Sequence, residues 1–164
     1  MTEEHPHAEP ELPYGVGPWP GGQEAWPADP RYDPELLANG DARNVVDVYR
    51  YWSMDAIVAD LDERRHPFHV AIENWQYDSN IGSIVRSANA FLAAEVHIIG
   101  RRRWNRRGAM VTDRYQHVRH HEDVAAFAAW ADAASLPILA IDNVPGSEPV
   151  DRAELPERLS LIHI

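Results

Sequence analysis

The sequence of 164 residues contains no cysteine and no lysine. The absence of cysteine excludes a disulfide framework and every metal site built from thiolates. No apolar run reaches the roughly 20 residues that cross a bilayer, and the first residues lack the apolar stretch of a secretory signal. The sequence therefore predicts a cytoplasmic protein with no membrane partner.

Because lysine is absent, all 15 basic residues are arginines, whose planar guanidinium groups match the geometry of phosphate. The net charge of −11 weighs against a nucleic-acid partner. The charges are unevenly distributed, however, because residues 66–120 carry eight bases and only four acids. This central third is the only basic part of the chain, and we expect any polyanion to bind there.

The chain divides into segments of different composition. Residues 1–34 hold eight of the thirteen prolines and predict a disordered tail. Residues 35–66 form an expected helical segment, with a helix over 41–63 that Asp41 caps and a second cap at Ser53. In residues 67–158 strands alternate with helices, which predicts an α/β fold with a mostly parallel sheet flanked by helices. The expected strands are 68–72, 96–99, 115–119 and 138–141, and the expected helices are 80–92 and 122–134, with Val124, Phe127, Ala128 and Ala131 facing inward.

The stretch NIGSIVRSANAF, residues 80–91, follows the first expected strand. Asn80 and Gly82 open a helix, and either they serve only as its cap and turn or Asn80 also orients a ligand. Arg86 lies off the apolar face, among small polar residues and with no acid three or four positions away. It is either a solvated arginine or one available to an external phosphate. A strand, a polar turn and a helix with such an arginine are typical of an anion or nucleotide site.

An arginine-rich loop follows the second expected strand. Loops at the carboxyl ends of parallel strands form the ligand crevice of α/β sheets. Proteins that bind RNA commonly use guanidinium groups to contact phosphates and aromatic rings to stack on bases, and this loop contains both residue types. The alternative interpretation is a charged loop that is only solvated. The predicted RNA-binding residues are Arg101, Arg102, Arg103, Trp104, Arg106 and Arg107.

Other polar residues give weaker signals. His117, His120 and His121 lack carboxylates in register, so we interpret them as strand and surface histidines rather than metal ligands. Asp142 and Asn143 follow a strand, where turn formation is the stronger explanation. The sequence therefore predicts no metal site.

The residues Asn80, Gly82 and Arg86, as N-x-G-x-x-x-R after a strand, resemble the first motif of the SpoU/TrmH group of RNA ribose methyltransferases in the SPOUT superfamily. The loop GRRRWNRRGAMVTDRYQHV is similar to that of actinobacterial members, and the resemblance covers about residues 35–158. It implies an α/β domain with a trefoil knot in its carboxyl-terminal part, a homodimer, and methyl transfer from S-adenosyl-L-methionine to a ribose 2′-hydroxyl of tRNA or rRNA. It also implies that Arg86 is catalytic at the reacting hydroxyl and that Asn80 supports it.

The sequence departs from this pattern at its end, where the family's second and third motifs are expected and the chain reads LSLIHI. These residues look like translated sequencing adapter, so we expect 159–164 to be non-native. Residues 67–158 would then be a partial methyltransferase domain, inactive alone, without the knot and with unknown cofactor-binding residues. A non-catalytic RNA-binding module is the alternative. A Rossmann-like nucleotide-binding domain is disfavoured because G-x-G-x-x-G is absent.

Overall fold

The computed structural model describes residues 15–75 and 80–163, and the chain divides between Ile57 and Val58 into two units. This boundary falls inside helix α2 (Met54–Asp62). No helix in the described ranges is long and apolar enough to cross a membrane.

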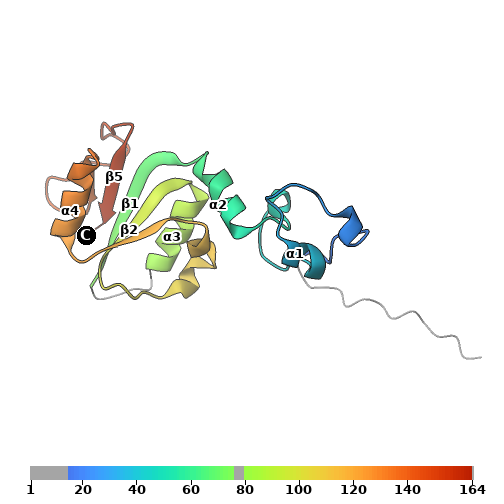
Figure 1. The fold of residues 1–164 in the computed structure, drawn as a ribbon. Coiled ribbons are helices and arrows are strands. Elements are labelled where there is room, and N and C mark those ends of the chain that lie inside the picture. Colours follow the sequence, from blue (N-terminus) through green and yellow to red (C-terminus); the bar gives the residue numbers. More distant parts are fainter. Residues whose placement is uncertain (1–14, 76–79, 164) are drawn as a thin grey trace, which may run out of the picture. The chain divides into compact units, whose positions relative to one another are not determined.

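The second unit is built on one sheet of five parallel strands (Figure 1) in the order β3-β2-β1-β5-β4. Parallel strands need crossover connections and cover on both faces, which is why helices alternate with strands here. The α/β fold predicted from the sequence is therefore confirmed. The strands are β1 (His66–Asn74), β2 (Ala93–Gly100), β3 (Val118–His121), β4 (Ile138–Ile141) and β5 (Leu159–His163).

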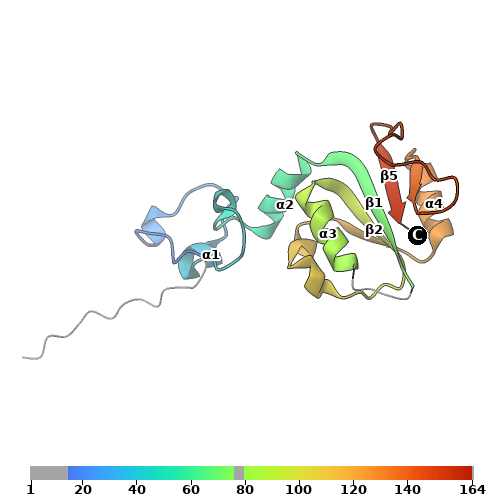
Figure 2. The same ribbon diagram turned by 180° about the vertical axis from the view of Figure 1, so that it is seen from behind.

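Helices α3 (Ile81–Ala90) and α4 (Val124–Ala133) cover opposite faces of this sheet, as Figures 1 and 2 show. Successive strand residues point to opposite faces, so Ile98 packs in the cluster that contains α3 and Ile99 in the cluster that contains α4. Each face of the sheet thus has its own apolar core. The polar residues at the ends of the strands lie outside these cores, where they can contact a ligand.

Two details of this unit differ from the sequence prediction. The expected strand 115–119 begins only at Val118, because the Arg65 guanidinium binds the Tyr115 carbonyl at 2.6 Å and the Gln116 side chain at 2.9 Å. Val124, expected to face inward, is 42% exposed, because it is the first residue after the Asp123 cap of α4. The arginine-rich loop contains two short 3-10 helices, η3 (Arg106–Ala109) and η4 (Thr112–Arg114).

Strand β5 lies between β1 and β4 and pairs with both. Leu159 and Ile162 are buried in it. The prediction that residues 159–164 are non-native concerns their origin and stays a prediction.

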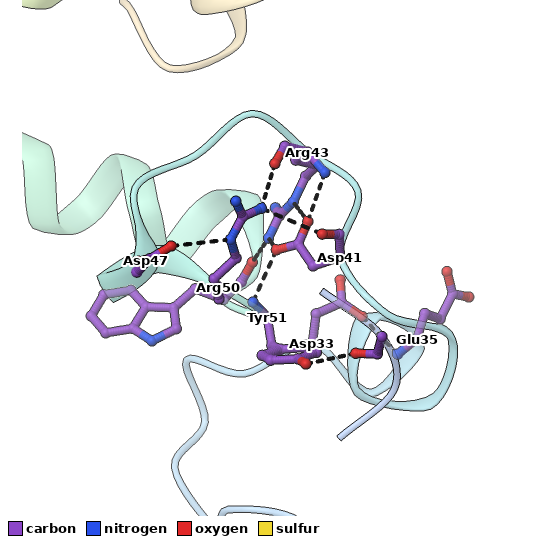
Figure 3. Close-up of polar contacts among 9 residues, drawn as sticks. Asp33, Glu35, Asp41, Arg43, Asp47, Arg50 and Tyr51 are labelled. Atoms are coloured by element: carbon purple, nitrogen blue, oxygen red, sulfur yellow. Dashed lines mark hydrogen bonds and ion pairs between the residues drawn. The ribbon is translucent and has the colours of Figure 1, made fainter. Parts of the chain in front are cut away.

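The first unit contains η1 (Gln23–Ala25), α1 (Pro34–Asn39) and η2 (Asp47–Tyr49). Of the helix expected over 41–63, the segment after Ser53 is confirmed as α2. The part before it is wrong, because the Asp41 carboxylate accepts hydrogen bonds from Arg43 and from the Tyr51 N–H and holds the chain in a turn (Figure 3). The cap at Ser53 is confirmed, since its hydroxyl accepts from the Ala56 N–H at 3.2 Å.

The structure also differs from the disordered tail expected over residues 1–34. The backbone N–H of Trp19 donates to the Leu37 carbonyl at 2.9 Å, and its ring packs edge-on against Tyr32 and Tyr51. The Tyr51 hydroxyl donates to the Gly17 carbonyl at 2.6 Å. Aromatic contacts therefore order residues 15–34, and residues 1–14 lie outside the described part of the chain.

Candidate nucleic-acid interface

The two residues predicted to be catalytic stand on α3. Asn80 precedes the helix and is exposed, and its side chain caps no helix N–H. Asn80 occupies the N-cap position and its carbonyl accepts from the Ile84 N–H at 3.0 Å, but the expected side-chain cap does not form. Arg86 is exposed, and it makes no hydrogen bond or ion pair with any residue in the ranges 15–75 and 80–163. Within those ranges the guanidinium of Arg86 therefore has no partner.

Gly82 brings the arginine-rich loop onto this helix. A Cβ on Gly82 would lie 2.6 Å from the Ala109 nitrogen and 2.7 Å from the Gly108 Cα, so only glycine permits the approach of η3. Helical side chains lean over the turn that precedes them, and for Arg86 that turn includes Gly82. The glycine of the motif therefore has a packing role: it joins the loop to the helix turn that the arginine covers.

The start of the same loop is fixed by Asn74, the last residue of β1. Its buried amide donates to the carbonyls of Arg101 at 2.7 Å and Arg103 at 2.9 Å. Its own carbonyl accepts from the Arg101 N–H at 3.1 Å. Sequence reasoning did not identify Asn74, although an amide at the end of a buried strand is a usable signal because a buried polar group needs partners.

A pocket of about 170 Å³ opens between this loop and β3. Arg102 and Arg106 line it, together with Trp104 and Asp113. The structure therefore brings three of the predicted RNA-binding residues together. Arg119 also lines the pocket, but its guanidinium lies on the α4 face of the sheet, beside Glu95 and over the Trp130 ring. The others, Arg101, Arg103 and Arg107, are exposed but do not line this pocket.

The charges in the pocket are not equally available. Arg106 lies over the Trp104 ring and pairs with Asp113 at 3.1 Å. Trp104 is half-buried against the α3 core, so it forms a wall and a support for Arg106 rather than a free stacking surface. Arg102 makes no hydrogen bond or ion pair among the residues described. An anion in this pocket thus meets the N–H groups of Arg102.

The three histidines noted in the sequence do not gather. His117 is exposed and lies 2.8 Å from Asp62, and His120 contacts the Gly100 carbonyl at 2.6 Å. His121 instead ends a buried chain with His97 and His69 on the α4 face, with nitrogen distances of 2.9 Å and 3.0 Å. His69 and His97 were missed because they stand in different strands, and only the sheet register brings them together.

Burial dominates the electrostatics of this chain of histidines. Burial, and next to it the neighbouring His69, His121 and Arg119, lowers the pKa of His97 to about 3. His97 is therefore neutral near pH 7. The Glu95 Oε2 atom lies 3.8 Å from His97 Nε2 and forms no ion pair with this neutral ring.

A second pocket, of about 490 Å³, lies beyond the carboxyl end of β4. Asp142 and Asn143 line it, and they also form the predicted turn, in which the Asp142 carboxylate accepts from the Asn143 N–H at 2.7 Å. Apolar residues at its walls include Ile141 and Val150. The pocket thus combines apolar surface with two acidic residues, Asp142 and Glu148, at an edge where α/β sheets bind ligands.

Two solved structures are similar to this chain. One solved structure, described as giving insight into the 2-OH methylation of C/U34 on tRNA, matches with 18% identity and a TM-score of 0.51, over 59% of this chain and 66% of that chain. Another is the SpoU methyltransferase AviRb from Streptomyces viridochromogenes in complex with AdoMet, with 21% identity and a TM-score of 0.49, over 61% of this chain and 41% of that chain. The chain therefore spans less than two thirds of either protein, and at these identities the likeness concerns the fold.

No curated protein matches the chain. A family model described as the SpoU rRNA Methylase family matches residues 67–162, from the start of β1 into β5. This match covers more than half of the sequence and contains α3, the arginine-rich loop and both pockets. The chain belongs to the SpoU rRNA Methylase family.

Proposed function

We propose that this chain is part of an enzyme that transfers a methyl group from S-adenosyl-L-methionine to a ribose 2′-hydroxyl of tRNA or rRNA. The observation that carries the proposal is Arg86, an exposed arginine with no partner in the described ranges, on the helix that follows the first parallel strand of a SpoU-family domain. A homodimer, as the resemblance implies, is part of the same proposal.

The role of Arg86 follows from its chemistry. A guanidinium is not deprotonated in proteins, so it is unsuited to act as a general base. It is suited to bind the phosphate next to the reacting ribose and to stabilise the alkoxide that develops on the 2′-oxygen. Asn80, whose amide is also exposed, would orient the hydroxyl or the guanidinium. Proton removal is left to the phosphate or to water.

The cofactor supplies an electrophilic methyl group on a sulfonium centre. The pocket beyond β4 fits such a nucleoside, because its volume of about 490 Å³ lies in the usual range for small-molecule sites. Ile141 and Val150 offer apolar surface to a base, and Asp142 offers a carboxylate to ribose hydroxyls. These residues would hold the cofactor, and the chain's own contribution is to bind and orient it.

The arginine-lined pocket would hold a phosphate of the RNA backbone away from the reacting nucleotide. Arg102, which has no partner among the residues described, offers N–H groups there, whereas Arg106 is already paired with Asp113. Such contacts position an RNA without reading its sequence, and they make affinity depend on salt. The net charge of −11 does not oppose this binding, because the basic residues are concentrated in the central third.

The test separates the two roles in the full-length protein. Arg86→Ala should lower methyl transfer by about 10²-fold or more, as expected for loss of a donor to a developing oxyanion, while RNA affinity changes far less. Arg102→Ala should weaken RNA binding and reduce the salt slope of log K by about 1, with the rate at saturating RNA unchanged. Transfer of labelled methyl groups and RNA binding at several salt concentrations are the measurements.

Arg114→Ala is the matched control, since Arg114 is an exposed arginine that does not line the pocket. Retained turnover in Arg86→Ala would remove Arg86 from the mechanism. An unchanged salt slope in Arg102→Ala would make the arginine-rich loop a solvated surface. RNA binding without any methyl transfer by the unmodified protein would favour a non-catalytic RNA-binding module.

A further inference from the structure

The sheet face covered by α4 carries a second group of polar side chains, on the side opposite to Arg86. His69, Glu95 and His97 each direct one ligand atom into a region where these atoms lie within 4.8 Å of one another. We propose that these three residues bind one divalent transition-metal ion of the zinc class. The site is independent of methyl transfer.

The register of two adjacent strands builds this group. His69 in β1 pairs with Glu95 in β2, and His97 follows Glu95 by two positions. Because side chains alternate along a strand, all three lie on the same face. Neighbouring positions on two strands therefore supply two imidazoles and one carboxylate without any contribution from a loop.

The distances suit a small ion. Zinc lies about 2.0–2.2 Å from nitrogen and oxygen ligands, so two ligands of a tetrahedral site stand about 3.3 Å apart. His69 Nδ1 lies 3.0 Å from His97 Nε2, and Glu95 Oε2 lies 3.8 Å from the same nitrogen. These two separations bracket the tetrahedral value, and the third, between His69 and Glu95, is at most 4.8 Å.

The surrounding contacts orient the ligands as an outer shell does. A ligating histidine usually donates its other N–H to a neighbour, and His97 Nδ1 lies 2.9 Å from His121 Nε2. Glu95 accepts from Arg119 through Oε1 at 2.9 Å, which leaves Oε2 for the ion. Two histidines with one carboxylate select zinc or a similar metal, whereas magnesium and calcium prefer oxygen ligands throughout.

The proposed metal site is covered by aromatic rings on one side and is accessible to solvent on the other. The Trp130 and Phe127 rings lie 4.2 Å and 5.4 Å from the His97 ring, measured between centroids. His97 is fully buried, but His69 and Glu95 are only partly buried, so an ion can enter and keep a water as its fourth ligand. Ser160, the β5 partner of His69, has a buried hydroxyl oxygen with no hydrogen-bond partner in the described structure and lies beside the group.

The competing explanation is a chain of neutral histidines joined only by hydrogen bonds. That explanation accounts for both imidazole contacts, but it gives no role to Glu95 Oε2, which stands too far from His97 to hydrogen-bond. The Arg119 guanidinium opposes a cation beside Glu95, so the affinity will be lower than in a site without it. The two explanations differ in what an added metal ion does.

The experiment titrates the folded chain, first freed of metal with a chelator, with Co²⁺ and with Zn²⁺. We expect one ion per chain by calorimetry and the visible absorption of tetrahedral Co²⁺. His69→Gln and Glu95→Gln replace partly buried ligands and should each weaken binding at least about 10-fold, the lower limit even for outer-shell residues. His97 is not replaced, because it is fully buried and its loss would disturb the core.

His117→Gln is the matched control, since His117 also faces a carboxylate, that of Asp62 at 2.8 Å, but stands alone on the surface. It should bind metal as the unmodified chain does. Histidine ¹⁵N resonances should shift at His69 Nδ1 and His97 Nε2 on addition of Zn²⁺. The proposal is overturned if the folded chain shows no saturable binding of either metal, or if His69→Gln and Glu95→Gln bind as well as the control.

Discussion

The buried carboxylate of Asp41 gives the sharpest test of how the first unit is held together. Its oxygens accept from the Arg43 backbone N–H at 3.0 Å, from Arg43 Nε and Nη2 at 2.8 Å and 2.7 Å, and from the Tyr51 N–H at 3.0 Å (Figure 3). The side chain of Asp41 is fully buried. A short segment without a long helix thus depends on one anion that satisfies four donors.

The pKa of Asp41 gives the size of the stabilisation. Burial raises the pKa of Asp41, but the hydrogen bonds from Arg43 and Tyr51 outweigh it and hold the pKa at about 2, against a usual value of 3.8. This difference corresponds to about 2 kcal/mol at ~1.4 kcal/mol per pH unit. Because the folded pKa is the lower one, this stabilisation is present above pH 3.8 and is lost as the pH falls toward 2.

We therefore expect Asp41→Asn to destabilise the first unit by about 3–5 kcal/mol at pH 7. The variant loses the pKa-linked contribution and also leaves the Arg43 guanidinium without a buried counter-charge. Hydrogen exchange followed by mass spectrometry reads this out in the peptide that contains the Tyr51 N–H. Its exchange, corrected for the intrinsic rate, should accelerate by about 10²-fold or more.

The control uses a second pair of the same spacing. Asp29 and Arg31 also stand two residues apart and form an ion pair, but both side chains are largely solvent-accessible, 31% and 53% exposed. Asp29→Asn should change protection little, because exposed ion pairs contribute about 0–1 kcal/mol. The reasoning is refuted if Asp41→Asn behaves like Asp29→Asn, or if it loses protection below pH 4 as the unmodified chain does.

Two further predictions concern the arginine-rich loop. Gly82→Ala should lower the free energy of unfolding in urea by about 1–3 kcal/mol, because the new Cβ would lie 2.6 Å from the Ala109 nitrogen. The control Gly17→Ala, whose Cβ would meet no atom within 4 Å, should change this free energy by at most about 0.5 kcal/mol. Equal losses in the two variants would contradict the close approach of η3 to Gly82. Asn74→Ala should lower the free energy of unfolding by about 1–3 kcal/mol and weaken RNA binding, because the carbonyls of Arg101 and Arg103 lose a buried donor. Asn143→Ala, at an exposed asparagine, should change neither quantity. Similar losses in both variants would show that Asn74 does not hold the loop.

Much of the second unit could be predicted because its elements have strong local signals. Apolar runs bounded by polar residues located β1 and β2, and helical spacing located α3. Strand β3 was shifted because the Arg65 contacts to residues 115 and 116 come from 50 positions away in the chain. The first unit was misjudged for a similar reason, since proline content predicts disorder but not the packing of Trp19 on Tyr51.

The candidate site shows the same limit. Arg86 was identified because its lack of an acidic neighbour is visible in the sequence, and the structure confirms that it has no partner among the residues described. Which residues of the loop share a pocket was not visible, because the opposite wall comes from Val118 and His120 of β3. The group of His69, Glu95 and His97 was invisible for the same reason, because the register of β1 and β2 alone creates it.

The register of β2 and β3 decides how the two proposals are tested. Arg119 lies opposite His97 in this register, and its guanidinium donates to Glu95, the carboxylate of the proposed metal site. The pocket that Arg102 lines contains Ile98 and Trp104, which belong to the apolar cluster on the α3 face. A variant of Arg119 would release Glu95 and change the charge beside the proposed metal site. Because Arg102 and His69 belong to groups on opposite faces of the sheet, variants at these two residues report on RNA binding and on metal binding separately.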